Sequence, residues 1–480
     1  MKVVLIRPPF YALFGVTTPK MKTYPLNLLY LATYARDVGG HEVALVDGEN
    51  VSVPGLEPAE GLGDDPETIM HAGIPRMIET LENPDHPLWI ELERTVMGHS
   101  PDLIGITCNS GNMDTVRNLV QRLIRHDIPV ILGGSHPTVL PEQSINYTGA
   151  DMVAVGEGEL TLARLLDSLP GGEALRTIPS LAWKSNGIVT VNPRGELITP
   201  IDTLPIPDRS FVDRKDYFGE VIMTGRGCPF NCAYCASRNI WGKRVRLRSV
   251  DSIVEELEQL RQAAETDRSS HPGMADEESR PGRWVVKVVD DTFTVNRSRT
   301  LNLLDAILDH GLDRFEFTGG VRADTLDEEV VLKMAGANFK RVTLGVESGS
   351  PRMLKMIRKG ETNEDVKRAV ELLRGAGIKS HTFFMIGFPD ETPEDIELSK
   401  KLIEDVRPDH VEINMVTPYP GTDLFERLIP EDPSGIDKWY RWFHQGMSTH
   451  SDRIGYDLDG AYEDFLEFAR RYHAGRGNTR

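Results

Sequence analysis

The chain of 480 residues is 40% hydrophobic and 26% charged, a composition that excludes a disordered protein and a disulfide-stapled miniprotein and predicts two or three domains. Its 54 basic and 73 acidic residues give a net charge of −19, which disfavours binding to nucleic acid and to anionic membranes. No apolar run approaches the roughly 20 residues of a membrane-spanning helix, so we expect small molecules or a specific partner protein as ligands.

The amino-terminal sequence MKVVLIRPP lacks the apolar run of a secretory signal peptide, because Arg7 and two prolines interrupt it. We therefore expect a cytoplasmic protein, whose thiols stay reduced. In that compartment, clustered cysteines indicate metal or redox chemistry rather than disulfides.

Short β-branched runs alternate with helical patterns over the first 170 residues, as in βαβ units and a parallel sheet. The predicted strands are residues 2–6, 43–46, 103–107, 129–133 and 152–155, and the clearest helices are residues 26–38 and 113–125. This pattern predicts an α/β domain over residues 1–180 with a flavodoxin-like, doubly wound sheet and an insertion at about residues 50–100. In such a sheet, ligands bind beyond the carboxyl ends of the strands.

A second alternation follows a proline-punctuated stretch at residues 181–217, which we predict to be a linker. Its predicted strands are residues 221–224, 285–289, 315–318, 342–346, 382–386 and 411–416, with helices at residues 250–264 and 363–376. Six βα units over residues 218–425 predict a partial (β/α)6 TIM-type barrel, with chemistry at the carboxyl ends of its strands. We expect a polar surface loop at residues 267–283 and a helical C-terminal tail at residues 426–480.

Three of the four cysteines, Cys228, Cys232 and Cys235, lie within eight residues, shortly after the first strand of the predicted barrel. A structural zinc site needs four ligands, and this sequence offers no second pair of cysteines to complete one. A 4Fe-4S cluster normally uses four cysteines, so three thiolates leave one iron with an open position. Catalysis needs such an open position, whereas electron transfer alone does not.

The spacing Cys-x3-Cys-x2-Cys, with Tyr234 before the last cysteine, resembles the signature of the radical S-adenosylmethionine superfamily. The resemblance implies that Cys228, Cys232 and Cys235 ligate a 4Fe-4S cluster and that S-adenosylmethionine chelates its fourth iron. One electron from the cluster would then cleave the ligand to a 5'-deoxyadenosyl radical. The cofactors carry that chemistry, while residues 218–425 would orient them and exclude water.

Motifs at later strand ends agree in order with this family. The resemblance implies contacts with S-adenosylmethionine from Tyr234, Asp290, Asp291, Arg322, Glu347, Gly387 and Pro389. Many members carry Gly-Gly-Glu where this chain has Asp290 and Asp291, so the group that meets the methionine amino group is left open, and helix capping is an alternative for both. Arg322 either pairs with a carboxylate or is solvated. The sequence from Gly387 to Thr392 resembles the Gly-x-Pro-x-Glu-Thr element that borders adenine, and it would also suit an ordinary turn.

Two glycine-bearing loops, which follow the fourth and fifth predicted strands, resemble those of the cobalamin-binding domain found ahead of many radical S-adenosylmethionine barrels. The implied cobalamin residues are Gly133, Gly134, Ser135, His136, Thr138, Gly156, Glu157 and Gly158, with Cys108 and Asn109 after the third strand. Glycine permits the close approach of backbone that a large planar ligand requires. Because the Asp-x-His-x-x-Gly motif of many cobalamin proteins is absent, we do not assign His136 as a cobalt ligand. Cys108 is equally typical of a small buried apolar residue.

The leading hypothesis is a cobalamin-dependent radical S-adenosylmethionine enzyme that methylates an unactivated carbon or phosphorus of a small-molecule substrate through methylcobalamin. An alternative is a cyclase or rearrangement enzyme resembling the anaerobic porphyrin-ring cyclases, whose Gly-Gly-x-His-Pro-Thr loop also matches. A cobalamin-binding sensor or carrier with a degenerate barrel is a third hypothesis, which the intact cysteine motif argues against. Methylthio transfer is disfavoured because no further cysteine set remains for an auxiliary cluster.

The resemblance also implies an electron donor such as flavodoxin or ferredoxin. A basic run follows the cysteines and consists of Arg238, Lys243, Arg244, Arg246 and Arg248. It could neutralise an anionic substrate or a reductase partner, but a solvated face is the favoured interpretation.

Overall fold

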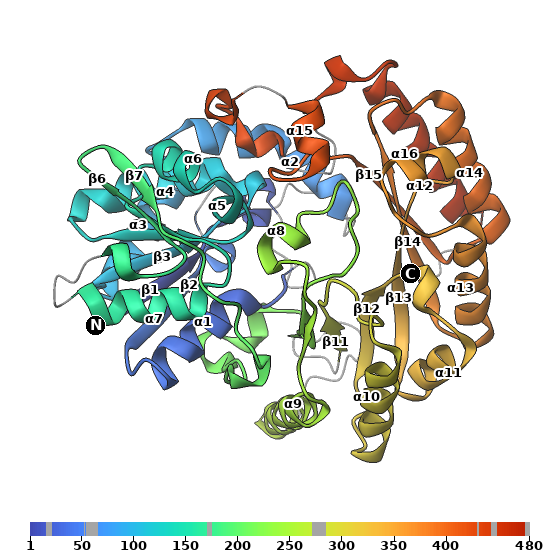
Figure 1. Ribbon diagram of the computed structural model, residues 1–480, viewed down its shortest axis with the longest axis horizontal. Coiled ribbons are helices and arrows are strands. Elements are labelled where there is room, and N and C mark those ends of the chain that lie inside the picture. Colours follow the sequence, from blue (N-terminus) through green and yellow to red (C-terminus); the bar gives the residue numbers. More distant parts are fainter. Residues whose placement is uncertain are drawn as a thin grey trace. The chain divides into compact units, whose positions relative to one another are not determined.

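The computed structural model describes residues 1–15, 22–51, 53, 66–169, 175–270, 285–429, 432–442 and 449–475, and its ribbon is shown in Figure 1. The chain divides into two compact units. The first comprises Met1–Phe218, Asn239–Trp241 and Glu431–Arg441, and the second comprises Gly219–Arg238, Gly242–Pro430 and Trp442–Arg480. Among the described residues, no helix has both the length and the hydropathy to span a membrane.

The first unit is built on a seven-stranded sheet with the order β2-β1-β3-β4-β5-β6-β7. Its five parallel strands are β1 (Lys2–Arg7), β2 (Glu42–Asp47), β3 (Leu103–Thr107), β4 (Val130–Gly133) and β5 (Met152–Ala154). The order 2-1-3-4-5 is that of a flavodoxin-like sheet, so the predicted fold class is confirmed. Each of the five strands overlaps the residues from which it was predicted.

Two further strands, β6 (Leu181–Ser185) and β7 (Ile188–Val191), continue this sheet with antiparallel pairing. They lie in residues 181–217, so the prediction of a linker is wrong for that part of the chain. Asn186 and Gly187 join them with φ values of 49° and 81°. An Asn-Gly pair with two positive φ angles makes the preferred two-residue hairpin turn. The sequence therefore contained a local hairpin motif, but the nearby prolines led to the prediction of a linker.

Helices flank the sheet of the first unit. They are α1 (Leu26–Asp37), α2 (Pro66–Glu82), α3 (Pro87–Gly98), α4 (Met113–Leu123), α5 (Ser135–Val139), α6 (Pro141–Thr148) and α7 (Gly158–Ser168). Helix α4 buries the apolar stripe that its period predicted, from Val116 to Leu123. Helices α2 and α3 occupy the predicted insertion, whose residues 52 and 54–65 lie outside the described residues.

The second unit holds six parallel strands in sequential order, β15-β14-β13-β12-β11-β8. They are β8 (Glu220–Ile222), β11 (Val285–Val288), β12 (Glu316–Val321), β13 (Phe339–Glu347), β14 (Lys379–Ile386) and β15 (His410–Met415). A two-stranded sheet adds β9 (Gly225–Arg226) and β10 (Arg246–Leu247). Sequential parallel pairing is the order of a TIM-type barrel, and the six predicted strands are all present.

The connecting helices of the second unit pack against its strands around one apolar core (Figure 1). They are α9 (Val250–Ser270), α10 (Arg297–Asp309), α11 (Glu328–Gly336), α13 (Asn363–Gly375) and α14 (Pro393–Val406). Helix α12 (Pro351–Met356) belongs to a second apolar cluster, and α8 (Ser237–Trp241) has its last three residues in the first unit. Helix α9 runs into the predicted surface loop as far as Ser270, and residues 271–284 of that loop lie outside the described residues.

The C-terminal region contains α15 (Asp423–Leu428), short 3-10 turns and α16 (Leu458–Ala474). Helix α16 packs against β15 and α14, and its buried side chains, among them Tyr462 and Phe465, belong to the core of the second unit. Trp439 is buried and belongs to the first unit. The region predicted as a tail therefore contributes core residues to both units.

Gly134 follows β4, and its substitution tests how closely the loop after β4 packs against the backbone of Cys108. Its φ is +113°, and a Cβ atom there would lie 2.3 Å from the Cys108 carbonyl oxygen. Strain and overlap together predict that Gly134→Ala destabilises the first unit by at least about 2 kcal/mol. Gly133→Ala is the matched control, because its Cβ would meet nothing within 4 Å. Equal melting temperatures for both variants would contradict this account of the loop.

Candidate functional site

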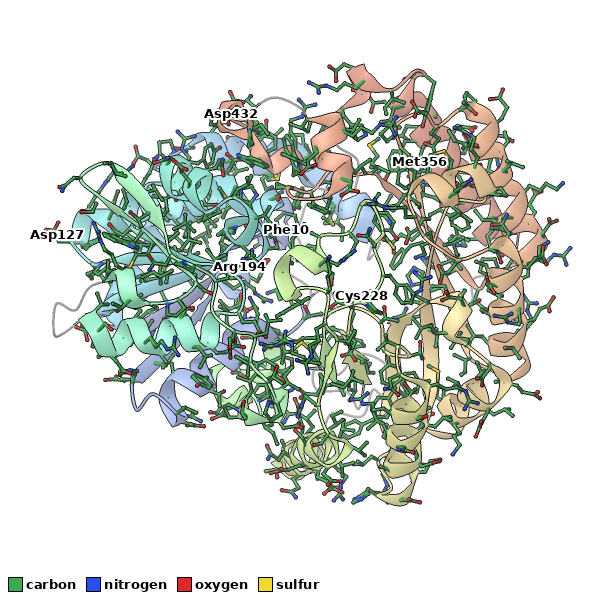
Figure 2. All side chains as sticks on the ribbon, viewed as in Figure 1. Phe10, Asp127, Arg194, Cys228, Met356 and Asp432 are labelled. Atoms are coloured by element: carbon green, nitrogen blue, oxygen red, sulfur yellow. The ribbon has the colours of Figure 1, made fainter. Side chains whose placement is uncertain are left out.

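The three clustered cysteines lie on the loop between β9 and α8, and Cys228 is labelled in Figure 2. All three are free thiols. Desolvation raises the pKa of the Cys235 thiol to about 11. The Cys228 Sγ atom lies 3.7 Å from the Thr292 hydroxyl, which places the loop beside the carboxyl end of β11.

A buried charge cluster lies beside this loop. The Tyr234 hydroxyl donates to Glu347 Oε1 at 2.8 Å, and the Lys359 ammonium donates to the same oxygen at 3.1 Å. Lys359 also pairs with Glu361 at 3.3 Å, and all three charged residues are less than a tenth exposed. Glu347, at the end of β13, has a φ of +69°. Glu347, which the sequence predicts to contact S-adenosylmethionine, is thus hydrogen-bonded directly to Tyr234 of the cysteine loop.

Arg322 makes a second contact with the cysteine loop. Its guanidinium lies 3.6 Å from the centre of the Phe230 ring, a cation–π geometry. It donates to Asp324 at 2.8 Å and to the Lys359 carbonyl oxygen at 3.0 Å, and only 6% of it is exposed. Arg322 is therefore not solvated, and its guanidinium is already paired within the protein. Phe230 and Lys359 were not singled out from the sequence, because neither belongs to a strand-end motif.

The adjacent carboxylates after β11 have different surroundings. Asp290 accepts from the Thr224 amide at 2.6 Å, from the Thr224 hydroxyl and from the Gly225 amide. Asp290 thereby joins the end of β11 to the loop after β8. Asp291 is exposed and accepts from the Gly227 amide at 3.0 Å. Of the two, Asp291 is the carboxylate with room for a ligand, which the sequence alone left open.

The turn after β14 is closed by its own acidic residue. Gly387 has a φ of +99°, and its amide donates to Glu391 Oε2 at 2.6 Å. Pro389 is buried within the same turn. Burial raises the pKa of Glu391 to about 7, and the Tyr456 hydroxyl donates to the same oxygen at 2.6 Å. Glu391 was recognised as part of the motif but was given no role of its own.

The basic run after the cysteines is only partly a solvated face. Lys243 and Arg244 are exposed as expected. Arg246 and Arg248 are buried, and Arg248 forms a buried ion pair with Glu256. The interpretation as a solvated face is therefore wrong for these two arginines.

In the first unit, the predicted cobalamin loops follow β3, β4 and β5. The Thr138 hydroxyl accepts from the Gly156 amide at 2.9 Å, which ties the loop after β4 to the loop after β5. Gly133 has open space where a Cβ would stand. Asn109 is exposed and forms a capping box with Asn112. The loop edge therefore presents bare backbone, as a planar macrocycle requires.

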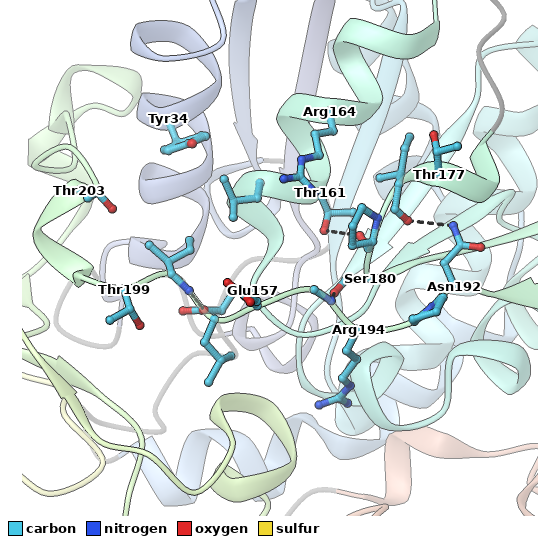
Figure 3. Close-up of a pocket in the computed structure, with 18 of the residues that line it drawn as sticks. Tyr34, Glu157, Thr161, Arg164, Thr177, Ser180, Asn192, Arg194, Thr199 and Thr203 are labelled. Carbon is cyan, nitrogen blue, oxygen red and sulfur yellow. Dashed lines mark hydrogen bonds between the residues drawn. The ribbon is translucent and has the colours of Figure 1, made fainter.

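Other predicted residues of these loops are engaged within the protein. Ser135 and Gly158 begin α5 and α7. Glu157 accepts from the Ile198 amide at 3.0 Å. Glu157 also lines a cavity of about 970 Å³ formed with α1, α7 and the chain from Asn192 to Thr199 (Figure 3). None of the other predicted cobalamin residues lines that cavity.

His136 and Cys108 lie beneath the loop surface. The Nδ1 atom of His136 is 2.9 Å from the Ser110 hydroxyl, and its Nε2 atom is 3.0 Å from Gln143 Oε1. Both ring nitrogens are thus occupied, and Trp439 covers the ring edge-on with centroids 4.4 Å apart. Cys108 is 2% exposed, with its Sγ atom 3.0 Å from the Met113 sulfur. Both side chains support the loops from within.

The cysteine loop supplies three free thiols, the ligand type that an iron–sulfur cluster takes. No three His, Cys, Asp or Glu side chains within the described ranges are grouped to hold a single metal ion. A cubane cluster instead takes one thiolate on each iron, which three neighbouring cysteines on one loop supply. Burial raises the pKa of the Cys232 thiol, and the nearby Lys359 and Arg322 cations oppose that rise. Cations beside the loop favour the thiolate form that metal ligation needs.

His136 predicts a pH dependence of stability. Burial lowers its pKa from 6.5 to about 4. Between those values the unfolded chain binds a proton that the folded chain does not, so stability falls as the pH drops from 6.5 towards 4, by up to about 3 kcal/mol. Thermal unfolding at pH 7 and pH 5 measures the effect. His136→Asn, which does not titrate, should show a smaller difference between the two pH values, and an unchanged difference would contradict the assignment.

Lys359 predicts a large loss of stability. Lys359→Met leaves Glu347 buried without its cation, while Glu361 keeps Arg322 at 3.7 Å, so we expect a cost of about 3 to 5 kcal/mol. Lys355→Met removes an exposed lysine near the C-terminal end of α12 and should change the free energy of unfolding by less than about 0.5 kcal/mol. Denaturant unfolding of both variants checks the difference. Similar values for the two would show that the buried cluster does not depend on its lysine.

Comparisons with known proteins agree with this geometry. Residues 222–403 match the model of the radical SAM superfamily, and residues 79–166 match that of the B12 binding domain. An uncharacterized methyltransferase of Pyrococcus horikoshii is 32% identical over 92% of this chain and 86% of its own length. Cytidylyl-2-hydroxyethylphosphonate methyltransferase of Streptomyces wedmorensis is 24% identical over 89% of this chain and 81% of its own.

A similar fold is found in the radical S-adenosylmethionine methyltransferase TsrM of Kitasatospora setae. The two structures align with a TM-score of 0.67 and 21% identity, over 89% of this chain and 74% of TsrM. That likeness concerns the fold, while the two family models together with the Pyrococcus relative establish the family. The chain belongs to the radical S-adenosylmethionine superfamily and carries a B12-binding domain ahead of the radical SAM core.

Proposed function

We propose that this protein is a cobalamin-dependent radical S-adenosylmethionine methyltransferase that methylates an unactivated carbon or phosphorus of a small molecule. One observation carries the proposal: a single chain joins a three-cysteine loop at the carboxyl edge of a barrel to an open glycine edge on a flavodoxin-like sheet. The Pyrococcus relative, a methyltransferase by description, matches nearly the whole chain. That match favours methyl transfer over ring formation.

Cys228, Cys232 and Cys235 would hold the 4Fe-4S cluster. The cluster with S-adenosylmethionine supplies radical chemistry when bound, and cobalamin supplies the methyl group. The protein orients the thiolates by fixing two aromatic residues of their loop. Tyr234 is held by Glu347, and Phe230 packs against Arg322.

The S-adenosylmethionine site would be formed by the strand ends of the second unit. We assign Asp291 to the methionine amino group, because its carboxylate is exposed beside the cysteine loop. Glu347 would contact the methionine or ribose part, and the turn from Gly387 to Pro389 would border adenine. Asp290 and Arg322 act as positioning residues, since their polar atoms already hold neighbouring loops.

Cobalamin would lie on the loops after β3, β4 and β5 of the first unit. The residues that would contact it are Asn109, Gly133, Gly134, Ser135, Gly156 and Gly158, and the buried Thr138 would hold two of these loops together through its hydrogen bond with the Gly156 amide. His136 and Cys108 would support these loops rather than ligate cobalt, because both are buried and engaged. We further propose a cytoplasmic enzyme that receives single electrons from a donor such as flavodoxin or ferredoxin.

Two variants separate the two cofactor sites. After anaerobic reconstitution, Cys232→Ala should lack the cluster and form no 5'-deoxyadenosine, while it still binds cobalamin. Gly133→Trp fills the open space at the end of β4, so it should lose cobalamin and keep the cluster. Iron and cobalt spectroscopy with mass spectrometry of nucleoside products measures both outcomes. Loss of both cofactors in either variant would contradict the assignment of separate sites.

The transferred group is tested with isotope-labelled S-adenosylmethionine and candidate small-molecule substrates. The proposal expects the labelled methyl group in the product, together with 5'-deoxyadenosine. A ring-closed or rearranged product without the label would contradict methyl transfer and identify the cyclase alternative. A wild-type protein that binds cobalamin but forms no 5'-deoxyadenosine would contradict both, and would leave a cobalamin sensor or carrier.

A further inference from the structure

The turn from Gly387 to Thr392 follows β14 at the carboxyl edge of the barrel, where ligands meet this fold. Gly387 has a φ of +99°, a backbone conformation that residues other than glycine rarely adopt. Glu391 closes the turn by accepting from the Gly387 amide, and its side chain is buried. The Gly387 carbonyl oxygen, however, has its partner outside the turn.

That partner comes from the C-terminal region. The Nε2 atom of His450 lies 2.8 Å from the Gly387 carbonyl oxygen, and because a carbonyl only accepts, the ring nitrogen donates. Tyr456 donates to Glu391 Oε2 at 2.6 Å. A Cβ atom on Gly387 would lie 3.1 Å from both methyl groups of Leu458. Two hydrogen bonds from residues 449–458 thus converge on one turn, and the Leu458 side chain lies beside it.

These contacts rest on a firmly packed element. Helix α16 begins at Leu458 and packs against β15 and α14. Tyr462 and Phe465 bury its inner face in the core of the second unit. His450 is itself 1% exposed. A turn held by residues that are packed in this way is pre-organised, so little ordering is left to occur when a ligand binds.

We propose that residues 449–458 are a positioning element of the S-adenosylmethionine site, in which Tyr456 and His450 fix the turn that borders adenine. This inference rests on the proposed function. Neither side chain needs to touch the ligand, since both act through Gly387 and Glu391. Loosening the turn should weaken ligand binding and leave the iron–sulfur cluster intact.

The test uses the full chain with its cluster reconstituted. Tyr456→Phe removes one hydrogen bond to a buried carboxylate and should raise the Kd for S-adenosylmethionine about tenfold. His450→Gln, which can still donate, should have a smaller effect. Hydrogen exchange of the peptide containing Gly387 and Phe388, measured without ligand, should be faster in Tyr456→Phe than in wild type. Iron content should be the same in all variants.

Tyr472→Phe is the matched control. Tyr472 lies in α16, the helix that follows residues 449–457, and donates to the Pro408 carbonyl oxygen at 2.6 Å, before the amino end of β15. Its loss should change the ligand Kd by less than about twofold. Equal effects of Tyr456→Phe and Tyr472→Phe, or no effect of Tyr456→Phe, would overturn the inference. A wild-type protein that binds no S-adenosylmethionine would overturn the proposed function itself.

Discussion

The parallel pairing of the strands determines where functional side chains can gather in each unit. In a parallel sheet each strand is followed by a crossover, so the loops at the carboxyl ends of the strands all emerge along one edge. Those edges are cross-linked by side chains in both units. Thr138 joins the loops after β4 and β5, and Asp290 joins the end of β11 to the loop after β8. The functional loops are therefore extensions of the sheets rather than free segments.

Buried charge imposes a second constraint on the cysteine loop. Lys359, Glu347 and Glu361 are nearly inaccessible to water, and such charges persist only when they are paired. Tyr234 and Phe230 belong to the loop and contact Glu347 and Arg322. A movement of the loop would therefore break a bond to a buried charge. That cost holds the cysteine loop, through Tyr234 and Phe230, against Glu347 and Arg322.

The sequence allowed the central strands to be predicted because each is a short β-branched run between helical patterns. It did not show which of Asp290 and Asp291 is available to a ligand. Adjacent residues of an extended chain point to opposite sides, and only the folded chain shows that Asp290 is the one that faces Thr224. Lys359 was missed because its partner Glu347 lies twelve residues away, beyond any local motif. The hairpin at Asn186 was missed because the prolines of residues 200–207 favoured a linker.

The C-terminal region shows why its role could not be found from its sequence. Sequential pairing leaves β15 at an edge of the sheet, and an uncovered edge exposes backbone groups to association with other chains. Helix α16 covers it: His473 accepts from the Val411 amide at 3.1 Å, and the Tyr462 hydroxyl lies 3.5 Å from the Ile413 carbonyl oxygen. The chain that leads into this helix passes the turn at Gly387. The same C-terminal segment thus covers the edge strand with its helix and contacts the turn at Gly387 with the residues that lead into that helix.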